Sequence, residues 1–576
     1  MTELRILFVV VLLLATGCAA PPPADEASPA SQDVVGDAEP AFPLAEPTYT
    51  SKRPRDLSPL VDALDALGAT RLSELESRLA TATIPEIQAA MDAGALSSEE
   101  LVLHYVDRIK RYDVDKLNAV LELNPEALEI ARARDAERAD GTRGPLHGIP
   151  VLLKDNIATS DRMHTAAGAL ALRDWRPARD AFLVTQLRAA GAVILGKANL
   201  SEWANYLDPD LPNGFSALGG QTRHPHGAFD PLGSSSGSAV AVAARLATVS
   251  VGTETQGSII RPAEVNGIVG LKTSMGAWSR DMIVPLVEWM DVPGPMGRTV
   301  TDVAFLFAAG MGVDANDPVT DAAEELDGLD VSQLLDREAA RQRRVGVVTY
   351  GEAFFAALAE DAPAPPEGLD EDELASYRRW QSYYEAYDRQ ARQALEVLRE
   401  LQIDTVAIDW RERPQSPNPS AALRVGFRAA LDPFLARVDA PFDSMAAIVA
   451  YNNEDPANRI PFGQDFLAAS AEADLDDPDY AKAREENPRI AREHLDRLFD
   501  TYDIDVLIAG SQVYAAAGYP ALAVPSGLAD DGEPRGLVMI GRFLGEPDLL
   551  AVGYAYEQAT RARVEPDLDA VTASFP

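Results

Sequence analysis

Serine residues dominate the part of the sequence that could do chemistry. Ser234, Ser235 and Ser236 stand between two glycines, and Ser258 follows 24 residues after the first of them in the segment Thr-Glu-Thr-Gln-Gly-Ser. A glycine beside a serine lets successive backbone N–H groups turn toward one point, where they can hold an anion or a developing negative charge. The rest of the chain is therefore expected to be organised around residues 231–274.

Two simpler interpretations of this stretch fail. A flexible Gly/Ser linker would lie among polar residues, whereas these serines precede a small-residue helix expected over 238–247 and a strand expected over 248–252. A phosphate-binding loop would need a Gly-Lys-Ser/Thr ending or a spaced G-x-G-x-x-G, and the stretch has neither.

A serine nucleophile also needs a base, and histidine is the usual one. No G-x-S-x-G motif with a following triad is present, and the histidines form no Ser-His-Asp pattern; they are His104, His147, His164, His224, His226 and His494. Two lysines are alternatives, Lys154 after an apolar run and Lys197 after a glycine. From the residues alone, a lysine behind an apolar run is most often an edge residue whose ammonium reaches water.

Taken together, three features resemble the amidase signature family, most closely its peptide-amidase-like members. They are the serines in the Gly-rich loop, the pattern G-T-E-T-x-G-S-I-x-x-P-A, and the pattern G-x-V-G-L-K, and the resemblance extends over about 84–568. It implies an α/β fold with one large mixed β-sheet flanked by helices on both faces, and no cofactor or metal.

The resemblance also implies roles for individual residues. Ser258 matches the family's nucleophile, Ser234 the bridging serine on a cis peptide bond, and Lys154 the base, which ranks Lys197 lower. Ser236 is a further serine in the loop and leaves the bridging assignment open, although the 24-residue spacing favours Ser234. The oxyanion hole is expected from four backbone N–H groups, those of Thr255, Gln256, Gly257 and Ser258.

Three side chains are candidates for the substrate cleft. Gln221 and Arg223 belong to a family-like loop, although Arg223 could equally form a surface salt bridge. Gln256 stands where many relatives have glycine, so it could narrow the cleft or reach the substrate.

Composition excludes one class of partner. The chain of 576 residues carries 51 Lys and Arg against 90 Asp and Glu, a formal charge of -39. A surface this acidic repels a phosphate backbone, and no basic patch of useful length is present, so nucleic acid is not expected as a partner.

The N-terminus predicts export. Residues 4–15 form an apolar run behind Arg5 that is short for a membrane span and ends at Thr-Gly-Cys. This resembles a bacterial lipoprotein signal over 1–18, with Cys18, the only cysteine, as the lipidated residue. An ordinary secretory signal and an uncleaved anchor are the alternatives. Residues 19–50, rich in Pro, Ala, Asp and Glu, are expected to form a disordered tether.

The remaining chain divides into a helical lead-in over 51–82 and a catalytic domain over 83–570, with an acidic insertion expected near 356–377. Residues 380–401 are expected to form a long helix, and 505–509 the last buried strand.

The expected function is hydrolysis of a carboxamide to a carboxylate and ammonia, with C-terminally amidated peptides as the favoured substrates. The alternatives are a broad amidase or aryl-acylamidase with esterase activity, and a non-catalytic peptide-binding envelope lipoprotein. A tRNA-dependent amidotransferase component is disfavoured by export and acidity. The expected site is the bacterial cell envelope, periplasm-facing and held by the lipid anchor alone, with the outer membrane preferred because Ala19 follows the cysteine. The oligomeric state is left open.

Overall fold

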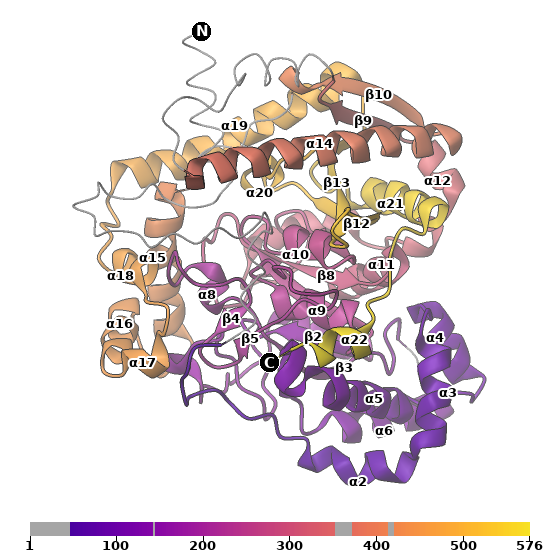
Figure 1. Cartoon of the computed structure of the whole chain (residues 1–576), viewed down its shortest axis with the longest axis vertical. Helices are drawn as coiled ribbons and strands as arrows, with labels where there is room; N and C mark the ends of the chain where they lie inside the picture. The colour runs from indigo at the N-terminus through magenta and orange to yellow at the C-terminus, as the bar shows by residue number, and fades with distance from the viewer. Residues whose placement is uncertain (1–45, 142–143, 352–370, 413–419, 576) are drawn as a thin grey trace.

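The computed structural model describes residues 46–141, 144–351, 371–412 and 420–575. Through this part of the chain runs one mixed sheet of 11 strands with helices packed around it (Figure 1). Helices α2 to α6 lie toward one end of the molecule, and α14 and α19 lie toward the other. The predicted fold class, a large mixed sheet flanked by helices, is confirmed.

The strands follow a spatial order quite different from their order in the sequence. In the order of their hydrogen-bonded neighbours they are β1 (Val120–Leu123), β3 (Val193–Ala198), β2 (Pro150–Lys154), β6 (Val249–Glu254), β8 (Val292–Gly297), β7 (Val269–Lys272), β12 (Ala521–Leu528), β13 (Pro534–Gly541), β11 (Val506–Ile508), β9 (Arg344–Thr349) and β10 (Asp404–Asp409). A separate two-stranded sheet pairs β4 (Phe215–Ser216) with β5 (Gly220–Gln221).

The centre of the sheet explains where the chemistry gathers. Strand β2 runs parallel to both of its neighbours, with Leu153 opposite Lys197 of β3 and opposite Val251 of β6. All residues of β2, β3 and β6 are buried, as expected of parallel strands covered on both faces. Because β2 and β6 are parallel, their carboxyl ends lie at the same edge, which brings Lys154 next to Thr253.

The chain up to residue 351 contributes helices, some of them from local sequence signals that are easy to read. Ser97 and Glu100 form the capping box that the sequence predicts for α5, with Ser97 Oγ accepting from the Glu100 N–H at 3.0 Å. The helices here are α2 (Ser58–Leu67), α3 (Ala69–Leu79), α4 (Ile84–Asp92), α5 (Ser98–Arg108), α6 (Ala127–Ala139), α7 (Phe182–Ala189), α8 (Glu202–Asn205), α9 (Ser236–Ala243), α10 (Ile260–Val265), α11 (Val300–Gly310) and α12 (Arg337–Arg341). Shorter helical turns are η1 (Ile109–Leu117), η2 (Leu170–Leu172), η3 (Pro318–Leu326) and η4 (Val331–Gln333).

The chain from residue 371 onward departs from the sequence prediction at two places. Helix α14 begins at Glu371, inside the predicted acidic insertion, whose residues 356–370 lie outside the described part. Strand β11 is not the last strand, because β12 and β13 follow and pair beside it. The elements here are α14 (Glu371–Glu400), η5 (Trp410–Glu412), α15 (Ser420–Arg437), α16 (Met445–Asn453), α17 (Pro456–Arg459), α18 (Asp465–Ala471), α19 (Pro478–Tyr502), α20 (Val513–Ala517), α21 (Glu546–Thr560) and α22 (Leu568–Ala573).

The end of the predicted tether belongs to the folded part. The Thr50 N–H donates to Asn458 Oδ1 at 2.9 Å, and the Ser51 hydroxyl donates to the Asn458 carbonyl at 2.6 Å. The prediction that residues 19–50 are all disordered is therefore wrong for 46–50, which are described and packed. The predicted signal over 1–18 lies outside the described residues. Among the described helices, none has the length and apolar character needed to cross a membrane.

Candidate active site

Lys154, the last residue of β2, is fully buried and surrounded by oxygen atoms. Its Nζ lies 2.8 Å from Ser234 Oγ, 3.0 Å from Ser235 Oγ, 3.0 Å from Thr253 Oγ1 and 3.2 Å from the Thr253 carbonyl oxygen. Burial lowers the pKa of Lys154 to about 7, although the nearby carboxylates of Asp291 and Glu254 oppose the shift. About half of the Lys154 side chains are therefore neutral at pH 7 and able to accept a proton.

Ser234 lies at the strand ends in the loop that opens helix α9. Its peptide bond with Gly233 is cis, at the serine to which the family resemblance assigns that bond. The Ser234 carbonyl accepts from the Ser201 N–H at 3.1 Å. Helix α9 comes close to its neighbours because its residues are small: a Cβ built on Gly237 would lie 2.4 Å from the Asn199 carbonyl oxygen. The small residues of α9 therefore let the serine loop reach the sheet.

Ser235 ties this loop to the nucleophile segment. Its hydroxyl donates to the Thr253 carbonyl at 3.0 Å, and its N–H donates to the Ser258 carbonyl at 3.1 Å. Thr253 Oγ1 in turn accepts from Asn156 Nδ2 at 3.0 Å. Because the Ser235 hydroxyl proton is used by Thr253, its oxygen can act toward Lys154 only as an acceptor.

Ser258 stands on a turn that a buried carboxylate shapes. Glu254 accepts from the N–H groups of Gly257 at 2.7 Å, Ile259 at 2.8 Å and Ile260 at 3.0 Å. Gly257 has φ +82°, a conformation that favours glycine. Ser258 is 8 % exposed, and its hydroxyl has no hydrogen-bond partner within the described part of the chain. The hydroxyl is therefore reachable from solvent and uncommitted.

The predicted oxyanion hole needs one correction. The Gly257 N–H is already bonded to Glu254, so it is not free to bind an oxyanion in this structure. The N–H groups of Thr255, Gln256 and Ser258 donate to no group among the residues described, and they remain the candidates.

Asp291 holds the segment around residues 286–287 against residues 255–258, the nucleophile turn. One carboxylate oxygen accepts from Thr255 Oγ1 at 2.5 Å, and the other accepts from the N–H groups of Leu286 at 2.7 Å and Val287 at 2.9 Å. Asp291 is thus both a structural clamp and a negative charge that acts on Lys154. Sequence reasoning assigned no role to Asp291, Thr253 or Ser235. Ser235 and Thr253 carried a signal, since the first is a neighbour of the bridging serine and the second belongs to the family pattern.

Lys197 is equally buried but serves another part of the fold. It lies inside β3 and not after a turn, and its Nζ donates to the Ile157 carbonyl and, at 2.9 Å, to Thr165 Oγ1. Lys197 pairs with Leu153, so it lies on the opposite face of the sheet from Lys154. The ranking of Lys154 above Lys197 agrees with these contacts.

No histidine within the described residues contacts the serines. Burial lowers the pKa of His104 and of His224 to about 3, so both are neutral. His147 Nε2 lies 2.8 Å from the Arg134 carbonyl oxygen, and His164 Nδ1 lies 2.9 Å from Glu122 Oε1. Lys154 is therefore the basic side chain that the fold brings to Ser234.

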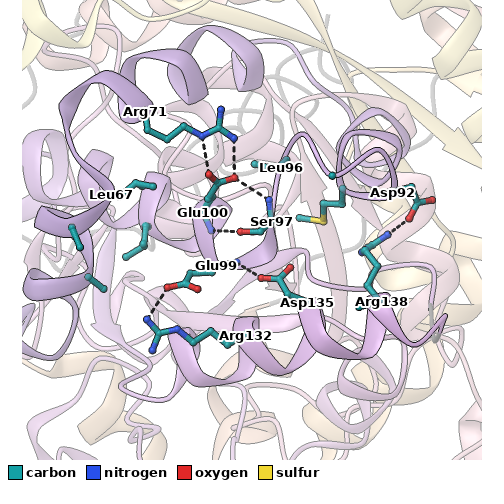
Figure 2. A pocket seen from close by; sticks show the side chains of 16 residues that line it. Leu67, Arg71, Asp92, Leu96, Ser97, Glu99, Glu100, Arg132, Asp135 and Arg138 are labelled. Atoms are coloured by element: carbon teal, nitrogen blue, oxygen red, sulfur yellow. Dashed lines mark hydrogen bonds and ion pairs between the residues drawn. The ribbon is translucent and has the colours of Figure 1, made fainter.

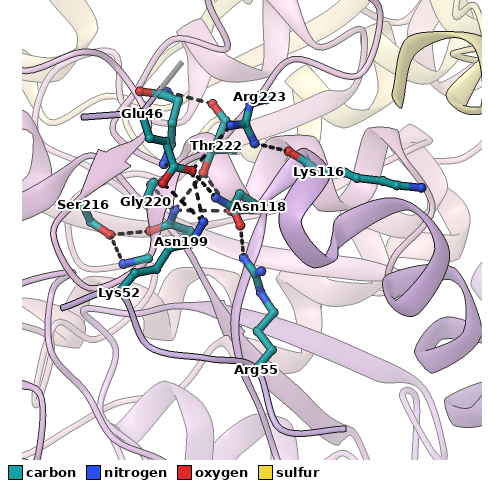
Figure 3. Close-up of polar contacts among 12 residues, drawn as sticks. Glu46, Lys52, Arg55, Lys116, Asn118, Asn199, Ser216, Gly220, Thr222 and Arg223 are labelled. Carbon is teal, nitrogen blue, oxygen red and sulfur yellow. Dashed lines mark hydrogen bonds and ion pairs between the residues drawn. The ribbon is translucent and has the colours of Figure 1, made fainter. Parts of the chain in front are cut away.

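Two of the three predicted cleft residues are internal. Gln221 Nε2 donates to the carbonyls of Asn213 at 2.7 Å and Thr222 at 2.8 Å. Arg223 Nη1 donates to the Lys116 carbonyl at 2.6 Å, and Figure 3 shows its guanidinium beside Glu46. Both side chains are buried: Gln221 bonds to carbonyls of its own loop, and Arg223 lies beside Glu46 of the packed N-terminal segment, so their assignment to the cleft is wrong. Gln256 is half-buried on the nucleophile turn.

A groove of about 730 Å³ lies elsewhere, among α2, α5 and α6 (Figure 2). Six of its charged side chains form pairs: Arg71 with Glu100 at 2.8 Å, Arg132 with Glu99 at 2.7 Å, and Arg138 with Asp92 at 2.5 Å. Asp135 accepts from the N–H groups of Ser98 and Glu99, and Ser97 caps α5, so the groove does not compete with the site around Ser258.

Comparison with known proteins finds similarity to amidases. The sequence model of the Amidase family matches residues 100–356. An Arabidopsis thaliana protein described as a probable amidase is 34% identical over 521 residues, covering 88% of this chain and 95% of the relative. A glutamyl-tRNA(Gln) amidotransferase component of Halorhodospira halophila is 33% identical over 83% of this chain and 97% of the relative. The crystal structure of native peptide amidase from Stenotrophomonas maltophilia is similar with a TM-score of 0.73 and 40% identity, covering 85% of this chain and 99% of that one.

Proposed function

The chain belongs to the amidase signature family and is a hydrolase that acts on amides, and we propose that it releases ammonia from carboxamides through attack by Ser258. One observation carries the proposal: a buried lysine with a pKa of about 7 lies 2.8 Å from a serine in the loop that binds the Ser258 carbonyl.

The proposed reaction moves one proton along this row of side chains. Neutral Lys154 accepts the Ser234 proton as Ser234 accepts the Ser258 proton, and Ser258 Oγ forms a bond to the carbonyl carbon. The backbone N–H groups left uncommitted on the nucleophile turn stabilise the oxyanion. The C–N bond breaks as the relayed proton reaches the leaving nitrogen, so ammonia departs and an ester of Ser258 remains. Water then attacks that ester with the same base, releasing the carboxylate and restoring Ser258.

C-terminally amidated peptides are the proposed substrate class. The support is the 40% identity to a peptide amidase over 99% of that protein. A broad amidase with esterase activity is the second candidate, since an ester is a more reactive acyl donor for the same serine. The aryl acylamidase among the solved structures is 20% identical and supports the fold alone. A role on tRNA is not proposed, because the net charge of -39 disfavours a polyanionic partner.

Intact-mass measurement after treatment with a fluorophosphonate tests the nucleophile. We expect one adduct on the wild type, none on Ser258→Ala, and one on Ser236→Ala, whose serine donates to the Leu232 carbonyl and takes no part in the relay. The same three proteins are then assayed for ammonia release from a peptide amide. An adduct retained by Ser258→Ala would show that another residue is the nucleophile.

We also propose export with lipidation at Cys18, which rests on the sequence alone. Palmitate labelling of the expressed protein tests it: the label should be incorporated by the wild type and lost in Cys18→Ser. Labelling of both proteins, or of neither, would refute the anchor.

A further inference from the structure

A glutamine from the far end of the chain lies directly against the nucleophile turn. Gln512 follows strand β11 and immediately precedes helix α20. A Cβ built on Gly257 would lie 2.6 Å from Gln512 Nε2 and 3.3 Å from its Cδ. The Gln512 carboxamide therefore covers the α-carbon of the residue that precedes Ser258.

The Gln512 carboxamide is also uncommitted. Its side chain caps no helix and has no hydrogen-bond partner among the residues that the structure describes, and it is half-exposed. This contrasts with Gln221, whose carboxamide is bonded to two carbonyls. Gln512 thus presents one free acceptor and two free donors beside the reacting serine.

The chemistry of a carboxamide says what it would recognise. It offers an N–H and a C=O side by side, which complement the C=O and N–H of a peptide group. In a peptide amide, the last peptide group is attached to the α-carbon next to the scissile carbonyl, so its nitrogen is only about 2.5 Å from the attacked carbon. A simple carboxamide has no group at this position.

A charged substrate group is less suited to this position than a neutral one. The nearest basic side chain, Arg261, places its Cγ 3.0 Å from the same built Cβ, and its guanidinium lies 3.3 Å from Glu264 Oε2. A neutral peptide unit can bond to Gln512 without disturbing that ion pair.

We propose that Gln512 is a specificity-determining residue that binds the peptide group next to the scissile amide, so that acylated amino-acid amides are preferred to simple carboxamides. This inference rests on the proposed function. It adds a specificity-determining residue that is not one of the catalytic serines or the catalytic lysine.

Two substrates of matched side chain test it. They are N-acetyl-phenylalaninamide and 3-phenylpropanamide, and kcat/KM is measured for each by ammonia release. We expect the wild type to prefer the first substrate. In Gln512→Met, which keeps the length but loses the hydrogen bonds, the ratio of the two kcat/KM values should fall about tenfold. Gln512→Glu, which keeps the shape but loses the donors, should also lower the ratio.

Gln393→Met is the matched control. Gln393 is exposed on α14, which packs on β9, β10 and α21, and the substitution should change neither the ratio nor the activity. Thermal melting confirms that each variant is folded; if Gln512→Met does not fold, Gln512→Glu decides. A ratio within twofold of the wild type in a folded Gln512 variant would overturn the inference and leave the proposed function standing. A wild type that releases ammonia from neither substrate would overturn both.

Discussion

The base can be tested through its protonation. An ordinary lysine with a pKa of 10.5 is neutral in roughly one molecule in 3,000 at pH 7, whereas burial brings the pKa of Lys154 to about 7 and makes about half of it neutral. The difference between the two pKa values corresponds to a change of roughly 5 kcal/mol in the free energy of protonating the lysine. The neutral form is the active one, so kcat/KM should rise with pH, by about tenfold from pH 6 to pH 8.

Replacing Lys154 by arginine removes this titration. Its guanidinium stays protonated and cannot accept the Ser234 proton. We expect kcat/KM at pH 8 to fall by about 1,000-fold, within the range for loss of a general base. In Lys154→Met, kcat/KM should fall by a similar factor. Because methionine is not larger than lysine, this variant separates the loss of the base from the effect of arginine's larger volume.

Lys272 is the necessary control. It is fully buried, donates to the Tyr519 carbonyl at 2.8 Å, and has a pKa lowered to about 8 by burial, so it titrates in nearly the same range. In Lys272→Met the rise of kcat/KM should stay near pH 7. If the rise moves in Lys272→Met, or if Lys154→Arg keeps a tenth of the wild-type rate, the assignment of Lys154 as the base is refuted.

Two further changes test the surroundings of the site, and a third tests the packing of the N-terminal segment. Asp291→Asn keeps the hydrogen-bonding shape but removes a charge that raises the pKa of Lys154, so the rise of kcat/KM should move about one unit toward lower pH; an unmoved profile would contradict this. Ser235→Ala removes an acceptor 3.0 Å from the lysine and should lower kcat about tenfold with little change in KM, whereas an effect on KM alone would indicate a substrate contact. Gly220 has φ +77°, and a Cβ built on it would lie 2.7 Å from a carboxylate oxygen of Glu46. Gly220→Ala should therefore lower the free energy of unfolding in urea by roughly 2 kcal/mol. Gly328→Ala, at φ +74° in open space, should cost less, and equal losses would show that the carboxylate contact adds nothing.

The chemistry of the nucleophile turn could be predicted from the sequence because it is local. Residues 255–258 follow one another in the turn after β6, and the small residues of 238–247 predicted a closely packed helix, which the structure has as α9 over Ser236–Ala243. The family pattern added Lys154 and Ser234, and the structure places their side chains 2.8 Å apart. Apolar runs likewise predicted the central strands, which are buried on both faces.

Local sequence patterns were misleading where the packing of distant segments decides whether a residue is helical or buried. The charged residues after Glu371 read as an exposed loop, yet they begin α14, whose buried apolar residues Ala391, Ala394, Leu395 and Leu398 lie further along the helix. Arg223 reads equally as a cleft residue or a surface salt bridge, but the packed N-terminal segment buries it beside Glu46.

Only the tertiary structure brought Asp291 and Gln512 to the turn that carries Ser258. Nothing near either residue in the sequence marks it, since Asp291 contacts Thr255 across a loop and Gln512 reaches Gly257 from beyond β11. The order in which the strands pair decides which segments meet at the edge where β2 and β6 end. The sequence by itself thus determined which residues could carry the reaction, and the pairing of the sheet decided the charge, the hydrogen bonds and the neighbouring carboxamide that surround them.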